Sequence, residues 1–214
     1  MKKIIIILTC CFLMSFSNEG NDPNKPTILL IGDSMLDGLA RRFHDYAVEN
    51  GYNLRTVIWY GATSKHWARS KDLAYHIAEN KPVFIIMSCG TNEIGYHDMR
   101  VREECVRQIV QTIGDIPYVW IGPITWPRIK DNGMAAAIRR VVGEDNFFDG
   151  TSVQLARQRD GIHPTFEASA KWVDIIVKWI QRDDSPYSLK LRTPTRKTTL
   201  SNFISFKPSY KGRH

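Results

Sequence analysis

The sequence predicts an α/β fold, a three-layer α/β/α sandwich built on a five-stranded parallel sheet. The first observation is that short apolar runs alternate with helical patterns along most of the chain. The second is that these runs, such as residues 83–87, are apolar on both faces, as expected for parallel strands covered by helices on each side. Regular alternation of strands and helices implies right-handed crossovers, which pack helices on both faces of one sheet.

The pattern places five strands and five helices in strict alternation. The last helix is the best defined, because Thr165 is placed to cap its start and apolar residues recur every three or four positions. No repeat of about 20–50 residues is visible, which argues against solenoids and propellers. The strands are predicted over residues 27–31, 54–59, 83–88, 118–121 and 146–149, and the helices over residues 35–50, 68–79, 99–114, 133–143 and 165–181.

The first seventeen residues have the pattern of a secretory signal peptide. Lys2 and Lys3 form a basic start, residues 4–16 are an apolar stretch, and Ser15 and Ser17 are small residues at a cleavage position. The apolar stretch is short for a membrane span, which needs about 20 residues. We therefore expect residues 1–17 to be a signal peptide, followed by a short linker over residues 18–26. The protein is predicted to be exported, to the periplasm, the cell surface or the medium.

Two cysteines inside this leader leave a second route open. Cys10 and Cys11 follow Leu8 and Thr9, a faint likeness to the box in which a bacterial lipoprotein receives its lipid anchor. Simple cleavage, lipidation and an uncleaved anchor all remain alternatives. The other two cysteines, Cys89 and Cys105, are expected to be buried thiols, since two thiols do not form a disulfide framework.

The basic charge is concentrated at the C-terminus. The formal net charge is +7, and the segment from Arg182 onward carries eight basic residues against Asp183 and Asp184. The domain itself, over residues 27–181, is close to neutral, so its charge indicates nothing about the substrate. Residues 182–214 show no sustained period and are predicted to be an extended or disordered tail. This tail is expected to be either a solvated extension or a weak contact to an anionic surface.

Four motif blocks carry the candidate chemistry, and each follows a predicted strand or precedes the last helix. Because the carboxyl ends of parallel strands meet at one edge of the sheet, these blocks should converge there, as an active site requires. The blocks are Gly32-Asp33-Ser34-Met35, Tyr60-Gly61-Ala62-Thr63, Gly90-Thr91-Asn92-Glu93 and Asp160-Gly161-Ile162-His163-Pro164.

Ser34 is the candidate nucleophile. A serine hydroxyl needs an adjacent base, and the neutral imidazole of His163 can accept its proton and return it to the leaving alcohol. Asp160 can hold the imidazole in the correct tautomer. Ser34 could instead be a simple helix cap and His163 a surface histidine, and a backbone carbonyl could replace Asp160. The joint presence of the blocks favours catalysis.

The ordered set of blocks resembles the SGNH (GDSL-type) hydrolases, an esterase family named for its serine, glycine, asparagine and histidine. The resemblance covers residues 27–181 and implies a flavodoxin-like sheet. It also implies an oxyanion hole made by the backbone N–H groups of Ser34 and Gly61 and the side-chain amide of Asn92. Glycine permits close backbone approach, and an asparagine amide donates without bringing charge.

The chain departs from the family pattern at three places, none of which removes a catalytic position. Met35 replaces the usual leucine after the serine, and Glu93 replaces the usual aspartate after the asparagine. The third departure is the basic tail. Glu93 is expected to brace its loop and not to be catalytic.

Substrate-binding residues are less clearly indicated. Trp67, Tyr96 and Trp126 are expected in loops at the catalytic edge, where flat rings suit sugars, and Arg128 lies in the same loop as Trp126. The alternative is that these aromatic residues only cover the edge of the domain. The histidines show no ligand spacing with cysteines or acids, and no Gly-rich phosphate loop is present, so no metal, cofactor or nucleic-acid partner is predicted.

The sequence therefore predicts an exported carboxyl-ester hydrolase that works through an acyl-enzyme, most plausibly removing acetyl groups from carbohydrate. An O-acyltransferase or a (lyso)lipid acylhydrolase could use the same catalytic set. A catalytically silent carbohydrate-binding module is the alternative of another class, although such a module has no need of a nucleophile and a base.

Overall fold

The computed structural model describes residues 22–127, 129–151, 153–200 and 203–214. The predicted signal peptide, Cys10, Cys11 and Arg128 lie outside the described residues. Within them the chain forms an α/β fold with one parallel sheet of six strands, in the order β5-β4-β3-β1-β2-β6. In this part of the chain, the search for a helix of sufficient length and apolar character to cross a membrane found none.

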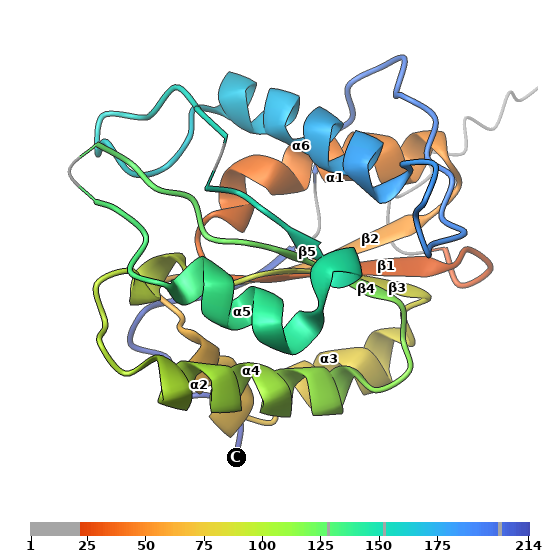
Figure 1. The fold of residues 1–214 in the computed structure, drawn as a ribbon. Coiled ribbons are helices and arrows are strands. Elements are labelled where there is room, and N and C mark those ends of the chain that lie inside the picture. The colour runs from red at the N-terminus through yellow and green to blue at the C-terminus, as the bar shows by residue number, and fades with distance from the viewer. Residues whose placement is uncertain (1–21, 128, 152, 201–202) are drawn as a thin grey trace, which may run out of the picture.

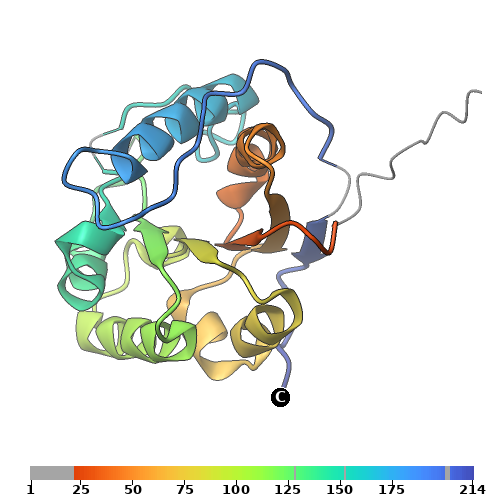
Figure 2. The same ribbon diagram turned by 90° about the vertical axis from the view of Figure 1, so that its right-hand side faces the viewer.

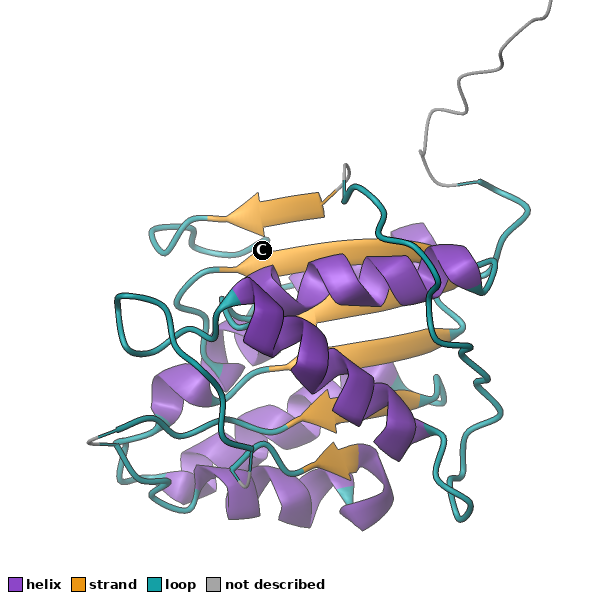
Figure 3. Cartoon of the chain, turned by 90° about the horizontal axis from the view of Figure 1, so that it is seen from above, coloured by secondary structure: helices purple, strands orange, loops and turns teal. Residues whose placement is uncertain are grey.

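All strands of the sheet run in one direction, as their arrows show in Figure 3. Apolar residues fill both faces of β1: Ile28 and Leu30 face one core, and Leu29 and Ile31 face the other. This two-sided burial explains why the strands read as continuous apolar runs. The strands are β1 (Thr27–Gly32), β2 (Asn53–Trp59), β3 (Phe84–Ser88), β4 (Tyr118–Ile121), β5 (Phe147–Phe148) and β6 (Phe203–Phe206).

Helices cover both faces of the sheet and give three layers (Figure 1). One face carries α1 (Leu36–Glu49) and α6 (Phe166–Ile180), which pack on each other over the core that contains Trp172. The opposite face carries the other four helices of the described chain, α2 (Ser64–Arg69), α3 (Asp72–Asn80), α4 (Met99–Ile113) and α5 (Met134–Val142). Two 3₁₀ turns, η1 (Thr91–Glu93) and η2 (Glu144–Asn146), complete the fold.

The predicted α/β fold with a parallel sheet is confirmed, but the sheet has six strands and not five. The five predicted strands are β1 to β5, with ends that differ by one residue at most. The helix predicted over residues 68–79 corresponds to α3, which begins only at Asp72, and residues 68–69 belong instead to the end of α2. The short helix α2 was not predicted as a separate element. It spans only six residues, too few for a helical period to repeat, and only Ser64 and Trp67 in it are buried.

The sixth strand corrects the expectation that residues 182–214 form an extended or disordered tail. β6 pairs with β2, with Thr56 beside Phe203 and Trp59 beside Phe206. Figure 2 shows this C-terminal segment, in blue, running from the end of α6 past α1 to the edge of the sheet. Its four-residue strand lies among polar and basic residues, so its apolar alternation is too brief to stand out in the sequence.

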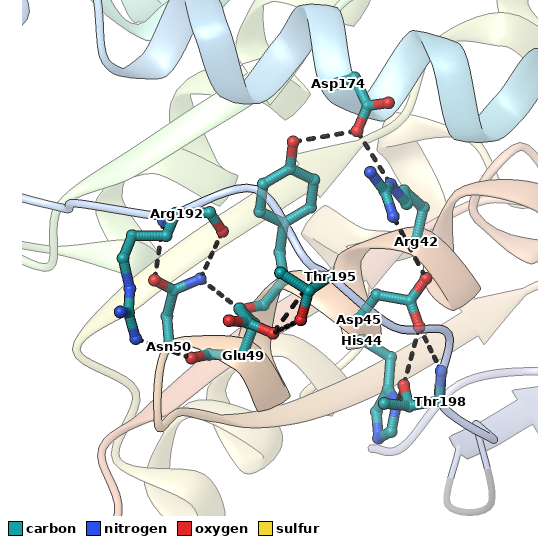
Figure 4. Close-up of polar contacts among 10 residues, drawn as sticks. Arg42, His44, Asp45, Glu49, Asn50, Asp174, Arg192, Thr195 and Thr198 are labelled. Atoms are coloured by element: carbon teal, nitrogen blue, oxygen red, sulfur yellow. Dashed lines mark hydrogen bonds and ion pairs between the residues drawn. The ribbon is translucent and has the colours of Figure 1, made fainter.

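Hydrogen bonds hold the segment before β6 against α1 (Figure 4). Asn50 exchanges two bonds with the backbone of Arg192, at 2.7 and 2.9 Å. The carboxylate of Asp45 accepts from the backbone N–H of Thr198 at 2.6 Å and from its hydroxyl at 2.8 Å. Leu189 and Leu191 of the same segment are buried in the core between the sheet and α6. The segment is therefore part of the domain.

The residues after β6 cover the outer edge of the sheet. Tyr210 stacks on Phe206 with ring centroids 4.3 Å apart and also packs on Trp59. The backbone N–H of Arg213 donates to buried Asp72 at 2.8 Å, and its guanidinium lies 3.7 Å from the ring centroid of Tyr75. These contacts fix the last residues of the sequence beside α3.

Candidate active site

The candidate site lies at the carboxyl edge of the sheet, where the strand order reverses. β1 has β2 on one side and β3 on the other, so the loops after these strands diverge and leave room between them. Ser34 follows β1, Gly61 follows β2 and Asn92 lies in η1 after β3. His163 approaches from the loop before α6. The four predicted blocks therefore converge on one edge.

Ser34, His163 and Asp160 form a continuous hydrogen-bonded chain. The Oγ of Ser34 lies 2.9 Å from Nε2 of His163, and Nδ1 of His163 lies 2.6 Å from Oδ2 of Asp160. An ionised carboxylate can only accept, so Nδ1 donates to it and Nε2 of the neutral ring is left to accept from the serine hydroxyl. The ring is thus held in the tautomer that a general base needs.

Asp160 is held in its charged form by the loop that carries it. The hydrogen bond with His163 is the main cause that lowers the pKa of Asp160 from 3.8 to about 2, and the backbone N–H of Ile162 adds to it. The carboxylate also accepts from the backbone N–H of His163 at 3.0 Å. Asp160 therefore remains ionised throughout the range near neutrality.

The histidine loop is anchored by two residues that the sequence did not single out. Arg157 donates to the carbonyl oxygens of Ile162, at 2.6 Å, and Thr125, at 2.5 Å, which ties the loop to the one after β4. Gln158 donates from its backbone to the carbonyl of His163 at 2.8 Å and from its side chain to that of Pro164 at 2.9 Å. Their acceptors are backbone carbonyls, which leave no mark in the sequence.

The residues expected to form the oxyanion hole are suitably disposed. Among the described residues, no group accepts a hydrogen bond from the backbone N–H of Ser34 or of Gly61. Gly61 has φ +72°, a backbone conformation that favours glycine. The side-chain amide of Asn92 donates one N–H to the carbonyl of Ala62 at 2.9 Å, which orients the amide and leaves its second N–H for a ligand.

Glu93 has the bracing contacts expected of it. Its buried carboxylate accepts from the backbone N–H and the hydroxyl of Ser64, both at 2.7 Å, and pairs with Arg102 at 3.0 Å. These bonds join η1 to the start of α2 and to α4. The loop of Asn92 is thereby fixed relative to the loop of Gly61.

Asp33, beside Ser34, is a buried acid with an unusual pKa. Its Oδ1 accepts from the backbone N–H of Met35 at 3.0 Å, and its buried Oδ2 makes no hydrogen bond of normal geometry. The backbone N–H groups of Thr91 and Gly90 are near enough to the carboxyl to oppose the rise in its pKa. Burial raises the pKa of Asp33 from 3.8 to about 7, and the nearby charge of Glu93 acts in the same direction. Asp33 helps to shape the serine turn and touches no reacting atom of the Ser34–His163 pair.

This pKa predicts how stability depends on pH. Between about pH 4 and pH 7 the folded protein retains a proton on Asp33 that the unfolded chain has lost, so the free energy of unfolding falls as pH rises. We expect Asp33→Asn, which keeps an acceptor for Met35, to remove this part of the pH dependence. The difference between wild type and variant should change by about 2–3 kcal/mol from pH 5 to pH 7.5. Urea unfolding at both pH values measures it, and parallel pH profiles of the two proteins would contradict the raised pKa.

A small cavity lies at Ser34. Its volume is about 130 Å³, and its lining includes Ser34, His163, Tyr60, Gln158 and Pro164. Cavities that hold drug-sized ligands are about 300–1,000 Å³. The space at Ser34 is therefore suited to a small group.

The described residues that were expected to bind substrate lie in three different environments. Trp67 is wrong as a rim residue: it is 1% exposed and packs against Trp59 in the core, because its side chain is on the inner face of α2. Tyr96 is 46% exposed but lines a different cavity from Ser34. Trp126 is half-buried in a bridge with Ile129 and does not line the cavity at Ser34. Arg128 lies outside the described residues.

The other titratable groups show no assembled metal site within the described chain. No group of three histidine, cysteine or acidic side chains gathers there as metal ligands. Cys89 and Cys105 are free, buried thiols, as expected, and burial raises the pKa of each.

Comparison with models of protein families found no match to this chain, and comparison with curated proteins found none either. The functional argument accordingly depends on the four motif blocks and on the geometry of the residues in them.

Proposed function

We propose that this protein is an exported serine esterase of the SGNH type that removes small acyl groups such as acetyl from carbohydrate. The observation that carries the proposal is the chain from Ser34 through His163 to Asp160, with distances of 2.9 and 2.6 Å. A binding module has no use for a nucleophile joined to a base in this way. The basic and apolar pattern of residues 1–17 supports export.

The reaction follows from the roles of these groups. Ser34 Oγ attacks the ester carbonyl carbon while Nε2 of His163 takes the hydroxyl proton. The oxyanion that develops accepts from the backbone N–H groups of Ser34 and Gly61 and from the amide of Asn92. The intermediate collapses, the alcohol leaves with the proton from His163, and an acyl group remains on Ser34. Water, activated by the same imidazole, then releases the acid.

Two further features support this class of reaction and a small acyl group. The strand order β2-β1-β3-β4-β5 is the flavodoxin-like order, in which ligands bind at the switch between the first and third strands. The cavity of about 130 Å³ at Ser34 favours acetyl over a long acyl chain.

The acyl-enzyme itself provides the test. Incubation with 4-nitrophenyl acetate, acid quenching and peptide mass spectrometry should find one acetyl group on Ser34, together with steady release of acetate. The Ser34→Ala protein should carry none. Acetylation at another residue, or an absence of both acetyl-enzyme and turnover, would contradict the proposal. Adding a sugar acceptor and analysing the products separates hydrolysis from acyl transfer.

Loss of an oxyanion donor should slow the reaction markedly. We expect Asn92→Ala to lower kcat by about 10²–10³ with little change in KM, since the amide acts on charge that develops after binding. Asn132→Ala is the matched control, because its exposed amide also bonds a loop carbonyl, that of Tyr96. A loss below about tenfold in Asn92→Ala would mean that this amide does not face the oxyanion.

A further inference from the structure

A second cavity, of about 470 Å³, has a markedly basic lining. Its basic residues come from three separate parts of the chain, and no acidic side chain of the described residues lines it. They are Lys65, His66 and Arg69 from α2, Arg102 from α4, and Lys211 and His214 from the C-terminal segment. This convergence was not visible in the sequence.

Most of the positive charge at this cavity lacks an internal partner. Arg102 pairs with buried Glu93, but Lys65, Arg69 and Lys211 have no ion-pair partner in the described part of the chain. Like charges around one cavity repel each other, and an anionic ligand relieves that repulsion. An α-carboxylate on His214 would offset one of these three charges, and the net charge of the cavity lining would remain positive.

The C-terminal contribution to the cavity is firmly held. Arg213, between the two lining residues Lys211 and His214, is bonded through its backbone N–H to Asp72 and through its carbonyl to the N–H of Lys71, at 2.7 Å. The basic charge predicted to contact an anionic surface is thus directed, in part, at a cavity of the domain itself.

Two residues that line the cavity are close in sequence to the candidate oxyanion hole. Thr63 lines it and is two residues from Gly61, a separation of at most about 7 Å along the chain. Tyr96 lines it and is four residues from Asn92, whose amide bonds Ala62. A ligand with an ester at Ser34 therefore reaches this cavity within the length of a short oligosaccharide.

We propose that this cavity binds the carboxylate or sulfate groups of an acidic oligosaccharide whose ester lies at Ser34. Its volume is within the range of ligand cavities, and the exposed ring of Tyr96 offers a flat face to a sugar. The hydroxyls of Thr63 and Ser70 add polar groups to the lining. The acylated substrate rests on the proposed esterase function, whereas the binding of acidic sugar does not.

Binding is tested without catalysis, by calorimetry on the Ser34→Ala protein with trigalacturonate, a sulfated disaccharide and neutral maltotriose. We expect an acidic sugar to bind, maltotriose not to, and Lys65→Glu/Lys211→Glu to weaken binding at least about tenfold. The matched control is Lys178→Glu/Lys190→Glu, with the same change of charge on exposed residues outside this cavity. Thermal unfolding checks that both variants fold, and the milder Lys65→Gln/Lys211→Gln repeats the test if the first does not.

The two acidic sugars identify the charged group that binds. Tighter binding of trigalacturonate assigns the cavity to carboxylate groups, and tighter binding of the sulfated disaccharide assigns it to sulfate groups. Equal weakening by both double variants, or no binding of either acid, overturns the proposal. Catalysis adds a second readout, in which Lys65→Glu/Lys211→Glu should lower the preference for acetylated acidic over acetylated neutral oligosaccharide. If the acidic sugars bind but the serine of the protein is not acetylated, the anion site is retained and the proposed esterase function is rejected.

Discussion

Replacing Ser34 or His163 by alanine is expected to lower kcat for ester hydrolysis by about 10⁴–10⁶ while leaving the domain folded. The Ser34→Ala variant lacks the attacking oxygen. The His163→Ala variant lacks the base, which is the only one among the described residues within hydrogen-bond distance of that oxygen. Both residues lie at the rim of the sheet, where truncation removes chemistry and little packing. Steady-state kinetics with 4-nitrophenyl acetate measures the loss, and circular dichroism measures the fold.

Because the two residues act as one unit, their effects should not add. The double variant Ser34→Ala/His163→Ala should be no slower than about tenfold below either single variant. Ser188→Ala, at an exposed position distant in the fold from the nucleophile, is the control and should retain full activity. Near-normal turnover in either single variant would reject the serine mechanism and with it the SGNH assignment.

The convergence of the candidate catalytic residues on one sheet edge could be predicted because it depends on local sequence. Ser34 and Asn92 lie in the loops that follow β1 and β3, so their placement at one sheet edge follows from the strands themselves. Asp160 and His163 are three residues apart in one turn, and their contact needs no long-range information. The predicted strands and long helices were located for the same reason, since each strand is a continuous apolar run and each long helix shows its own period.

The supporting contacts could not be predicted, because they join residues distant in sequence or use backbone atoms. Arg157 donates a hydrogen bond to the carbonyl of Thr125, and Glu93 accepts one from the hydroxyl of Ser64. Both partners are distant in the sequence. The prediction for Trp67 was wrong. We expected this residue in a loop at the rim, but it lies in the unpredicted helix α2, and its side chain packs in the core. A single helical turn shows no period from which its inner face could be assigned.

The C-terminal segment is the largest difference between prediction and structure, and it leads to a strong expectation. Deleting residues 185–214 should remove most of the free energy of unfolding. The deletion exposes the core around Leu189 and Leu191, each of which contributes about 1.5–3 kcal/mol by burial. It also removes the hydrogen bonds of Thr198 to Asp45, at about 1 kcal/mol each. Domains are stable by only about 5–15 kcal/mol in total, so the truncated protein should be largely unfolded at 37 °C and inactive on small esters.

Point variants show whether packing of this segment is the cause. Leu191→Ala should lower the free energy of unfolding by about 2–3 kcal/mol, as expected for a leucine lost from a core. Lys190→Ala is the matched control, because Lys190 is exposed between two buried leucines and should change stability by less than about 0.5 kcal/mol. Urea unfolding of the full-length protein and these variants gives the comparison. If the truncated chain unfolded at the same urea concentration as the full chain, residues 185–214 would not pack on the domain, and the sixth strand and the basic cavity would lose their support together.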